Sequence, residues 1–255
     1  MIQLKTTEEI AKMRAAGRLV YRVIHETGAL IRPGITTGEL EEHAIQIISD
    51  SGGSSPCLGY APAGHPPYPA WTCISVNEEI VHAIPGARVI KEGDLVTIDC
   101  CAELNGWLAD SAKTFPVGKV SPLAQKLLKV TEESLIRGIA QAKPGNRTGD
   151  IGAAVQKYAE SFGFSVVREL NGHGVGKSMH EGELHVPNFG FKGRGTVLQC
   201  GMTFAIEPMI NAGRRHIRTR QDGWTIVTQD GSLSAHFEHT VAIVPNGAEI
   251  LTNGD

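Results

Sequence analysis

Two apolar runs in this chain each end in an acidic residue. One is Gly93-Asp-Leu-Val-Thr-Ile-Asp99, and the other is Gly201-Met-Thr-Phe-Ala-Ile-Glu207. Each has the pattern of a glycine turn and a buried strand that ends in a carboxylate. Burying an unpaired carboxylate is costly, so each of these groups needs a cation or a shared proton. We therefore expect both acids to lie together at the site of the chemistry.

Three further residues have surroundings that suit metal ligands. Asp110 follows a hairpin-like Asn-Gly turn, which would return its strand beside the strand that ends at Asp99. His173 lies between glycines that let a ligand approach the backbone, and Glu238 directly precedes an apolar strand. Four carboxylates and one imidazole carry too much negative charge for one small cation. They suit two divalent ions with bridging carboxylates.

The elements that would position these residues occur twice. The segment Pro33-Gly-Ile-Thr-Thr-Gly-Glu-Leu40 returns as Pro144-Gly-Asn-Arg-Thr-Gly-Asp-Ile151, and both this pair and the pair of acid-ended strands repeat after roughly 110 residues. Each half has two helical patterns followed by strands. Alone, an acid at a strand end is more often a turn cap and a His between glycines a loop residue. Their conjunction in two similar halves favours the metal site.

We therefore predict an α+β fold in which two pseudo-symmetric helix-helix-strand halves, about 1–115 and 116–255, join their sheets in one domain covering 1–255. The predicted helices begin near Thr6, Thr36, Ser121 and Thr148, and the predicted strands cover 72–76, 94–99, 164–168, 202–207, 224–228 and 239–244. The long irregular stretch from Ser51 to Ala70 is expected to form a loop at the mouth of the site.

Composition excludes several classes of protein. The chain has 255 residues, of which 41% are hydrophobic, and no segment reaches the length of a membrane span. A net charge of −3 with well-mixed signs gives no sign of a nucleic-acid or membrane surface. The five cysteines form no CxxC pair, and the start has no signal-peptide pattern. These features predict reduced thiols and a cytoplasmic location.

Six motifs closely resemble those of type I methionine aminopeptidases, in their short bacterial form. The motifs are Cys57-Leu-Gly-Tyr60, Cys73-Ile-Ser-Val-Asn-Glu78, Val81-His-Ala-Ile-Pro85, Asn171-Gly-His-Gly-Val-Gly176, Ile206-Glu-Pro-Met209 and Phe237-Glu-His-Thr240. The resemblance covers about residues 3 to 252 in matching order and spacing. It implies the pita-bread fold, in which two pseudo-symmetric halves surround a dinuclear metal centre, in agreement with the internal duplication.

The resemblance also implies the roles of individual residues. The metal ligands would be Asp99, Asp110, His173, Glu207 and Glu238, with Asp110 and Glu238 bridging. His82 and His180 would contact the substrate at the scissile bond. The methionine side chain would be bound by Tyr60, Cys73 and Trp224, with Met179 at a pocket-wall position where phenylalanine is usual.

The implied activity is removal of the initiator methionine from nascent polypeptides when the second residue is small. A hydroxide that bridges the two ions would attack the scissile carbonyl, and Glu207 would carry the proton to the leaving amine. His180 would donate a hydrogen bond to the oxyanion. The carboxylate and imidazole ligands accept Co, Mn, Fe or Zn. Nothing in the sequence requires more than a monomer.

Several positions depart from the family pattern. The segment 61–67 replaces a shorter spacer and leaves open whether Tyr68 has a role in the pocket, while His236 and Cys101 stand where other residues are frequent. His65 is expected to be a solvated loop residue and not a ligand. The basic residues between Arg214 and Arg220 are expected to form a solvated hairpin, with a transient ribosome contact as the alternative.

Two other functions stay open on the sequence alone. A proline-directed aminopeptidase would share the fold, although such enzymes generally carry an extra N-terminal domain. A non-enzymatic binding module is the second alternative, but such relatives have lost metal ligands, and all five positions are intact here.

Overall fold

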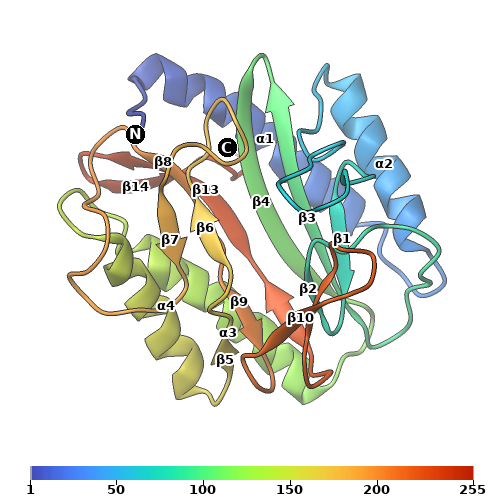
Figure 1. Ribbon diagram of the computed structural model, residues 1–255. Coiled ribbons are helices and arrows are strands. Elements are labelled where there is room, and N and C mark those ends of the chain that lie inside the picture. Colours follow the sequence, from blue (N-terminus) through green and yellow to red (C-terminus); the bar gives the residue numbers. More distant parts are fainter. Residues whose placement is uncertain (1, 255) are drawn as a thin grey trace.

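The computed structural model describes residues 2–254, and its elements follow the predicted order (Figure 1). Each half begins with two helices and continues into strands, which confirms the predicted fold class. The helices are α1 (Thr7–Gly28), α2 (Thr37–Asp50), α3 (Pro122–Ile139) and α4 (Thr148–Ser161). The strands are β1 (Cys73–Val76), β2 (Glu79–Val81), β3 (Leu95–Leu104), β4 (Trp107–Pro116), β5 (Ser165–Val166), β6 (Asn171–His173), β7 (His185–Pro187), β8 (Thr203–Ile206), β9 (Met209–Asn211), β10 (Ile217–Thr219), β11 (Ile226–Thr228), β12 (Ser234–His236), β13 (Glu238–Val244) and β14 (Gly247–Ile250).

Side-chain caps fix where the helices begin. At α1 the Thr6 hydroxyl accepts from the Glu9 backbone N–H at 3.2 Å, and the Glu9 carboxylate accepts from the Thr6 N–H at 2.9 Å. The same reciprocal box starts α2, whereas α3 begins with a serine cap and a proline in its first turn. These caps satisfy N–H groups that have no partner within the helix. The predicted helix starts are confirmed.

One six-stranded sheet joins the two halves. Its order is β1-β3-β4-β13-β14, and β8 also pairs with β13. The junction is the pairing of β13 with β4, where Glu238 lies opposite Ala112. Ala112 in turn lies opposite Asp99 on β3. The sheet register therefore brings acids from both halves to the same region.

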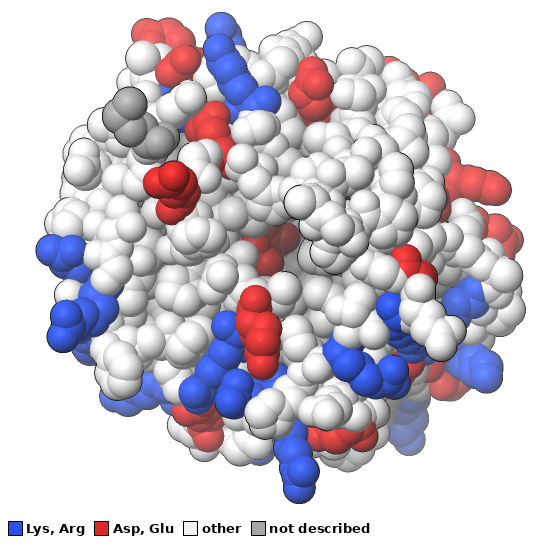
Figure 2. All heavy atoms as spheres, in the orientation of Figure 1, with Lys and Arg blue, Asp and Glu red and all other residues white. Residues whose placement is uncertain are grey.

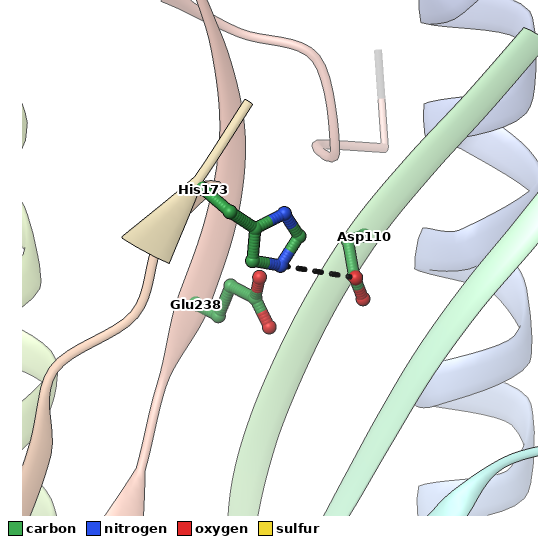
Figure 3. A group of neighbouring side chains, drawn as sticks. All are labelled: Asp110, His173 and Glu238. Carbon is green, nitrogen blue, oxygen red and sulfur yellow. Dashed lines mark ion pairs between the residues drawn. The ribbon is translucent and has the colours of Figure 1, made fainter. Parts of the chain in front are cut away.

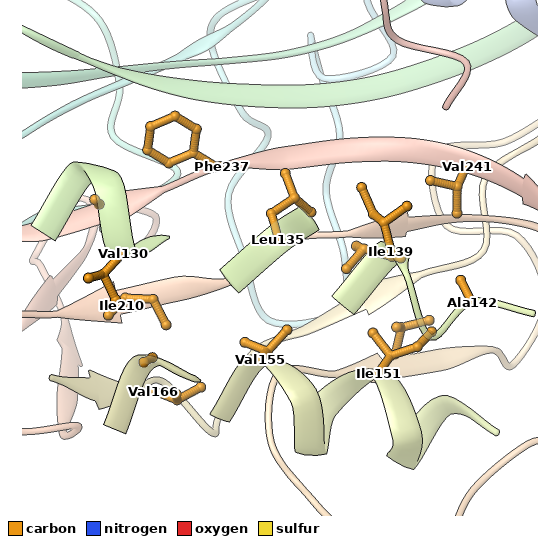
Figure 4. Packing of buried hydrophobic residues seen from close by; sticks show 14 of the residues in the cluster. Val130, Leu135, Ile139, Ala142, Ile151, Val155, Val166, Ile210, Phe237 and Val241 are labelled. Atoms are coloured by element: carbon orange, nitrogen blue, oxygen red, sulfur yellow. The ribbon is translucent and has the colours of Figure 1, made fainter. Parts of the chain in front are cut away.

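The helices pack on one side of this sheet. α1 passes behind β3 and β4 in Figure 1, and its residues Leu19 and Val23 share a core cluster with Ile98 and Ala109. In the second half, side chains from α3 and α4 pack together with strand residues such as Val241 (Figure 4). Burial of these apolar faces fixes the sheet, and the opposite face remains for the site.

The predicted strands lie at the right positions in the chain, but several differ in length from the observed strands. β3 extends five residues beyond the predicted end at Asp99, because its hairpin with β4 closes only at Asn105-Gly106, where both residues have positive φ. The predicted strands 164–168 and 224–228 shrink to β5 and β11. The short strands β6, β7 and β14 have no clear signal in the sequence. Among the described residues, no helix combines the length and apolar character that crossing a membrane requires.

Candidate metal centre and substrate cavity

Four strands of the central sheet place four acidic side chains around one point. Asp99 and Asp110 come from the β3–β4 hairpin, where Asp110 lies opposite Cys101. Glu238 begins β13, and Glu207 directly follows β8, whose last residue Ile206 lies opposite His239. Long-range sheet pairing, and not any local segment, therefore assembles the carboxylates.

His173 completes this group from the end of β6. Its Nε2 atom lies 3.6 Å from Oε1 of Glu207 and 3.9 Å from Oδ2 of Asp110. One ligand atom each from Asp110, His173 and Glu238 lies within 4.8 Å of the others (Figure 3). The five predicted ligand residues therefore converge on one region, and three of them already form a compact set of donors.

Burial changes the protonation of every member of this group. It raises the pKa of Asp110 to about 7, and it raises the pKa of Asp99, Glu207 and Glu238 well above their ordinary values, with the neighbouring carboxylates adding to the effect. Burial lowers the pKa of His173 to about 3, so its imidazole is neutral and offers a lone pair. A cation would remove the cost of ionising the acids.

The side chains fit a divalent metal. Oδ1 of Asp110 is buried and has no hydrogen-bond partner among the described residues, which is rare for a carboxylate oxygen. Carboxylate oxygens together with a neutral imidazole are donors that Mn, Fe, Co and Zn accept. Within the described residues no hydrogen bond satisfies Oδ1 of Asp110, and a bound cation would.

Hydroxyl groups hold the backbone beneath the acids. The Asp110 N–H donates to Oγ1 of Thr240 at 2.9 Å, and the same hydroxyl donates to the Asp110 carbonyl at 2.7 Å. The Ser111 hydroxyl donates to the carbonyl of Glu238 at 2.5 Å. These bonds tie β4 to β13 on both sides of the junction. They fix the positions from which the carboxylates project.

A cavity of about 90 Å³ opens above the ligand group. That volume holds several water molecules. Figure 2 shows a hollow near the middle of this face, with acidic atoms in its depth. All the residues that the resemblance implied line the cavity: Tyr60, Cys73, His82, Asp99, Asp110, His173, Met179, His180, Glu207, Trp224 and Glu238.

The two histidines expected at the scissile bond lie on the cavity wall. The ring centroid of His180 is 4.2 Å from that of His173, and the Nδ1 atom of His180 lies 3.2 Å from the Tyr60 hydroxyl. His82 has a φ of 58°, a left-handed conformation that costs a residue with a Cβ some strain. Burial lowers the pKa of His82 to about 4, so its ring is neutral at physiological pH.

Aromatic side chains form the outer wall. The Trp224 ring lies 5.2 Å from the Tyr68 ring in an edge-on arrangement, and its Nε1 donates to the carbonyl of Pro66 at 2.9 Å. Tyr68, whose role in the pocket the sequence left open, lines the cavity. His65 is exposed and away from the acids, as predicted, but its ring also lies 5.0 Å from that of Trp224. The segment 61–67 therefore supports the wall.

Five cavity residues were not among the predicted site residues: Cys57, Tyr68, Val81, Cys101 and His236. Cys57 begins the motif Cys57-Leu-Gly-Tyr60, whose last residue was predicted to line the pocket, so the motif could have indicated Cys57 as well. His236 is almost fully buried, yet neither ring nitrogen has a hydrogen-bond partner among the described residues. Its position two residues before Glu238 was the signal available in the sequence.

Comparison with known proteins gives a consistent result. Residues 11–245 match metallopeptidase family M24. A methionine aminopeptidase of Bacillus subtilis is 48% identical over 252 residues, which cover 99% of each chain. A methionine aminopeptidase B of Synechocystis is 46% identical over 98% of this chain and 91% of that protein.

The chain belongs to metallopeptidase family M24, with the methionine aminopeptidases. A solved methionine aminopeptidase of Thermotoga maritima superposes with a TM-score of 0.95 at 43% identity, covering 99% of this chain and all of that one. A prolidase of Pyrococcus furiosus gives a TM-score of 0.76 at 23% identity, and the match covers 66% of its length. The prolidase thus shares the fold alone. The chain is a metal-dependent hydrolase of the pita-bread fold, as the resemblance implied.

Proposed function

We propose that this enzyme removes the initiator methionine from nascent polypeptides whose second residue is small. The observation that carries the proposal is the convergence of Asp110, His173 and Glu238 beneath a cavity with His82 and His180 on its wall. The curated relatives that share nearly the whole chain bear the name of that activity. Neither alternative, a proline-directed peptidase or a binding module, has comparable support.

Five residues would hold two divalent ions: Asp99, Asp110, His173, Glu207 and Glu238. When bound, such ions acidify water and polarise a carbonyl group. Asp110 and Glu238 lie on neighbouring strands of the junction and belong with His173 to the compact donor set, so these residues would hold the ions most closely. Co, Mn, Fe and Zn all suit these donors.

The chain's own groups would handle the proton and the substrate. Glu207, whose pKa burial raises, can hold a proton at its carboxyl oxygen and give it to the leaving amine. His180 lies beside His173 and can donate a hydrogen bond to the carbonyl oxygen as negative charge develops there. His82 stays neutral and can orient the peptide group at the scissile bond.

The pocket for the methionine side chain would combine aromatic and sulfur-containing residues. Cys73 and Trp224 pack in one cluster with Tyr68, and Tyr60 packs against it. Met179 lies 3.9 Å from the Cys57 sulfur, measured between the sulfur atoms. Soft, polarisable groups of this kind suit a thioether.

The test is hydrolysis of a Met-Ala-Ser peptide by the protein supplied with Co²⁺ or Mn²⁺. Release of free methionine is the expected result, and an Xaa-Pro peptide should stay intact. Absence of methionine release from the metal-loaded protein would overturn the proposal. Cleavage of the Xaa-Pro peptide alone would favour the proline-directed alternative.

We extend the proposal to the cellular setting. The enzyme would act as a monomeric single domain in the cytoplasm, where new N-termini appear. A transient ribosome contact would use the basic residues around Arg218. The positive charge of that surface is smaller than the sequence suggests, because Arg220 forms ion pairs with Glu78 and Glu79. The nearest nitrogen and oxygen atoms are 2.6 Å apart in each pair. Co-sedimentation with ribosomes at low salt, compared between the enzyme and its Arg218→Ser variant, tests this contact.

A further inference from the structure

A buried ion pair joins the start of the chain to the loop that carries His180. The Lys5 ammonium donates to Oε2 of Glu181, and the two side chains are only 2% and 10% exposed. Lys5 precedes the capping residue of α1, and Glu181 directly follows His180. Charged side chains are rarely buried unless they are paired, and the partner of each is the other.

Glu181 also closes the loop on itself. Its backbone N–H donates to the carbonyl of Gly174 at 2.8 Å, and its Oε1 accepts from the backbone N–H of Lys177 at 3.0 Å. Gly174 is the neighbour of His173. The bonds of Glu181 therefore draw together the two ends of the segment 173–181, and these ends carry His173 and His180.

The fit inside this loop is tight. A Cβ atom on Gly176 would lie 2.3 Å from Oε1 of Glu181, and one on Gly174 would lie 2.1 Å from the carbonyl oxygen of Glu181. A side chain at Gly174 would clash with the backbone, and one at Gly176 would displace the Glu181 carboxylate from the position in which Lys5 neutralises it.

Lys5 is itself fixed to the second half of the molecule. Its backbone N–H donates to the carbonyl of Gly201 at 2.7 Å, and Gly201 begins the run that leads through β8 to Glu207. The Lys5–Glu181 pair therefore links the His180 loop to the strand that presents Glu207. Glu181 is next to His180 in the sequence, whereas Lys5 reaches the site through its bond to Gly201, and neither Lys5 nor Glu181 lines the cavity.

We propose that Lys5 and Glu181 are positioning residues, whose ion pair holds His180 at the distance from His173 that the reaction needs. The inference rests on the proposed function, because it assigns His180 a role in the chemical step. Misplacement of a reacting group by about 1 Å can cost roughly 100-fold in rate. Loss of the pair should therefore lower kcat and leave KM nearly unchanged.

The experiment compares variants of the full-length enzyme on a Met-Ala-Ser peptide at saturating Mn²⁺. Lys5→Met keeps the apolar stem and removes the charge, and Glu181→Gln removes the charge with little change in shape. We expect each to lower kcat roughly 10- to 100-fold with a change in KM below about 3-fold. Lys5→Arg should retain kcat within about 3-fold, because it restores a cation.

A matched control separates positioning from a general loss of stability. Arg14 forms a half-buried ion pair with Glu249, which ties α1 to β14 and does not touch the cavity. Arg14→Met should lower the melting temperature and leave kcat unchanged. In the metal-free protein, ring proton shifts of His180 measured by NMR should move in Lys5→Met and stay in place in Arg14→Met.

Two results would overturn the inference. One is a wild-type kcat in both Lys5→Met and Glu181→Gln, and the other is an equal loss of kcat in Arg14→Met at equal loss of stability. Glu181→Gln serves if Lys5→Met does not fold. Wild-type enzyme that releases no methionine would instead refute the proposed function, so the two failures are distinguishable.

Discussion

The floor of the cavity and its outer wall are built in different ways. The floor consists of carboxylates that project from paired strands, whose register is set by backbone hydrogen bonds and by hydroxyls such as that of Thr240. The wall consists of side chains from loops, where Trp224 is held by ring contacts and by one hydrogen bond to Pro66. In the floor, hydrogen bonds hold the backbone in place, but the carboxylates lack a cation to balance their charge. In the wall, the ring of Trp224 has its hydrogen bond, and packing between side chains holds it in place.

This contrast separates two kinds of function. An electrostatically unsatisfied floor binds cations strongly, and each of its side chains is hard to replace. A packed wall selects substrates by shape, so a change there alters affinity by the amount of contact that is lost. Substitutions in the floor should therefore act on the chemical step, and substitutions in the wall should act on the choice and binding of substrate.

The largest effect is expected in the floor. Glu207→Gln keeps the shape of the side chain and removes the group that moves the proton, so kcat should fall about 1,000-fold, a typical contribution of general acid–base catalysis. Steady-state kinetics on Met-Ala-Ser measure it. The exposed Glu183 is the control, since Glu183→Gln should behave as wild type. A Glu207→Gln variant with more than a tenth of wild-type kcat would contradict the role of Glu207.

The second effect concerns stability without metal. Burial raises the pKa of Asp110 to about 7 and that of Glu207 well above its ordinary value, so between pH 6.5 and 8 these carboxyls bind more protons in the folded state than in the unfolded state. Stability should then fall as pH rises, by up to about 1.4 kcal/mol per pH unit for each carboxyl that stays protonated. Histidines with lowered pKa, such as His173, act in the opposite sense, and their contribution fades as the pH rises above about 6.5, the pKa of an unfolded histidine.

Urea unfolding of the chelator-treated protein at pH 6.5 and 8 measures this difference. Added Mn²⁺ should reverse the trend, because the metal binds the ionised acids. Equal stability of the metal-free protein at the two pH values would show that the acids of the floor are ionised without a cation. The claim that the acids of the floor need a cation to balance their charge would then be wrong.

A smaller effect is expected in the wall. Trp224→Leu removes much of the aromatic surface around the proposed methionine pocket, and kcat/KM should fall roughly 10- to 100-fold, mainly through KM. Trp71 is the matched control, because it packs against the core cluster of α1 and α2, away from the cavity. Trp71→Leu should reduce stability and leave KM unchanged. A loss confined to kcat in Trp224→Leu would assign this residue to the chemistry.

The smallest effect is expected at His65, which touches Trp224 from outside. Its Nδ1 atom lies 2.9 Å from the carbonyl oxygen of Gly223. His65→Ala should loosen the Trp224 ring and raise KM about 2- to 5-fold, as one partly exposed contact is worth less than 1 kcal/mol. His216→Ala, at another exposed histidine, should leave KM unchanged. An unchanged KM in His65→Ala would show that His65 does not support the wall and that only residues inside the cavity form it.

The same contrast explains how much the sequence could predict. The acid-ended runs before Asp99 and Glu207, and the duplication around them, predicted a shared site and two similar halves, because strand patterns and helix caps are local signals. The wall was harder to predict. The place of Tyr68 depends on hydrogen bonds from its hydroxyl to the carbonyls of Thr72 and Ala83, both at 3.1 Å, and no local pattern encodes them.

Two other features escaped prediction for physical reasons. β3 continues beyond Asp99 because pairing with β4 outweighs the change to a polar residue within the strand. The Lys5–Glu181 pair joins residues that lie 176 positions apart, so only the folded chain brings the two charges together.

Counting bound metal ions tests the account most directly. Equilibrium dialysis of the chelator-treated enzyme against Mn²⁺, followed by elemental analysis, gives the number of ions per chain. We expect saturation at two ions for the wild type and weaker, incomplete binding for Asp110→Asn, because Asp110 belongs to the compact donor set. A wild-type protein that binds fewer than one ion per chain, or binds equally after Asp110→Asn, would contradict a metal centre built on these acids.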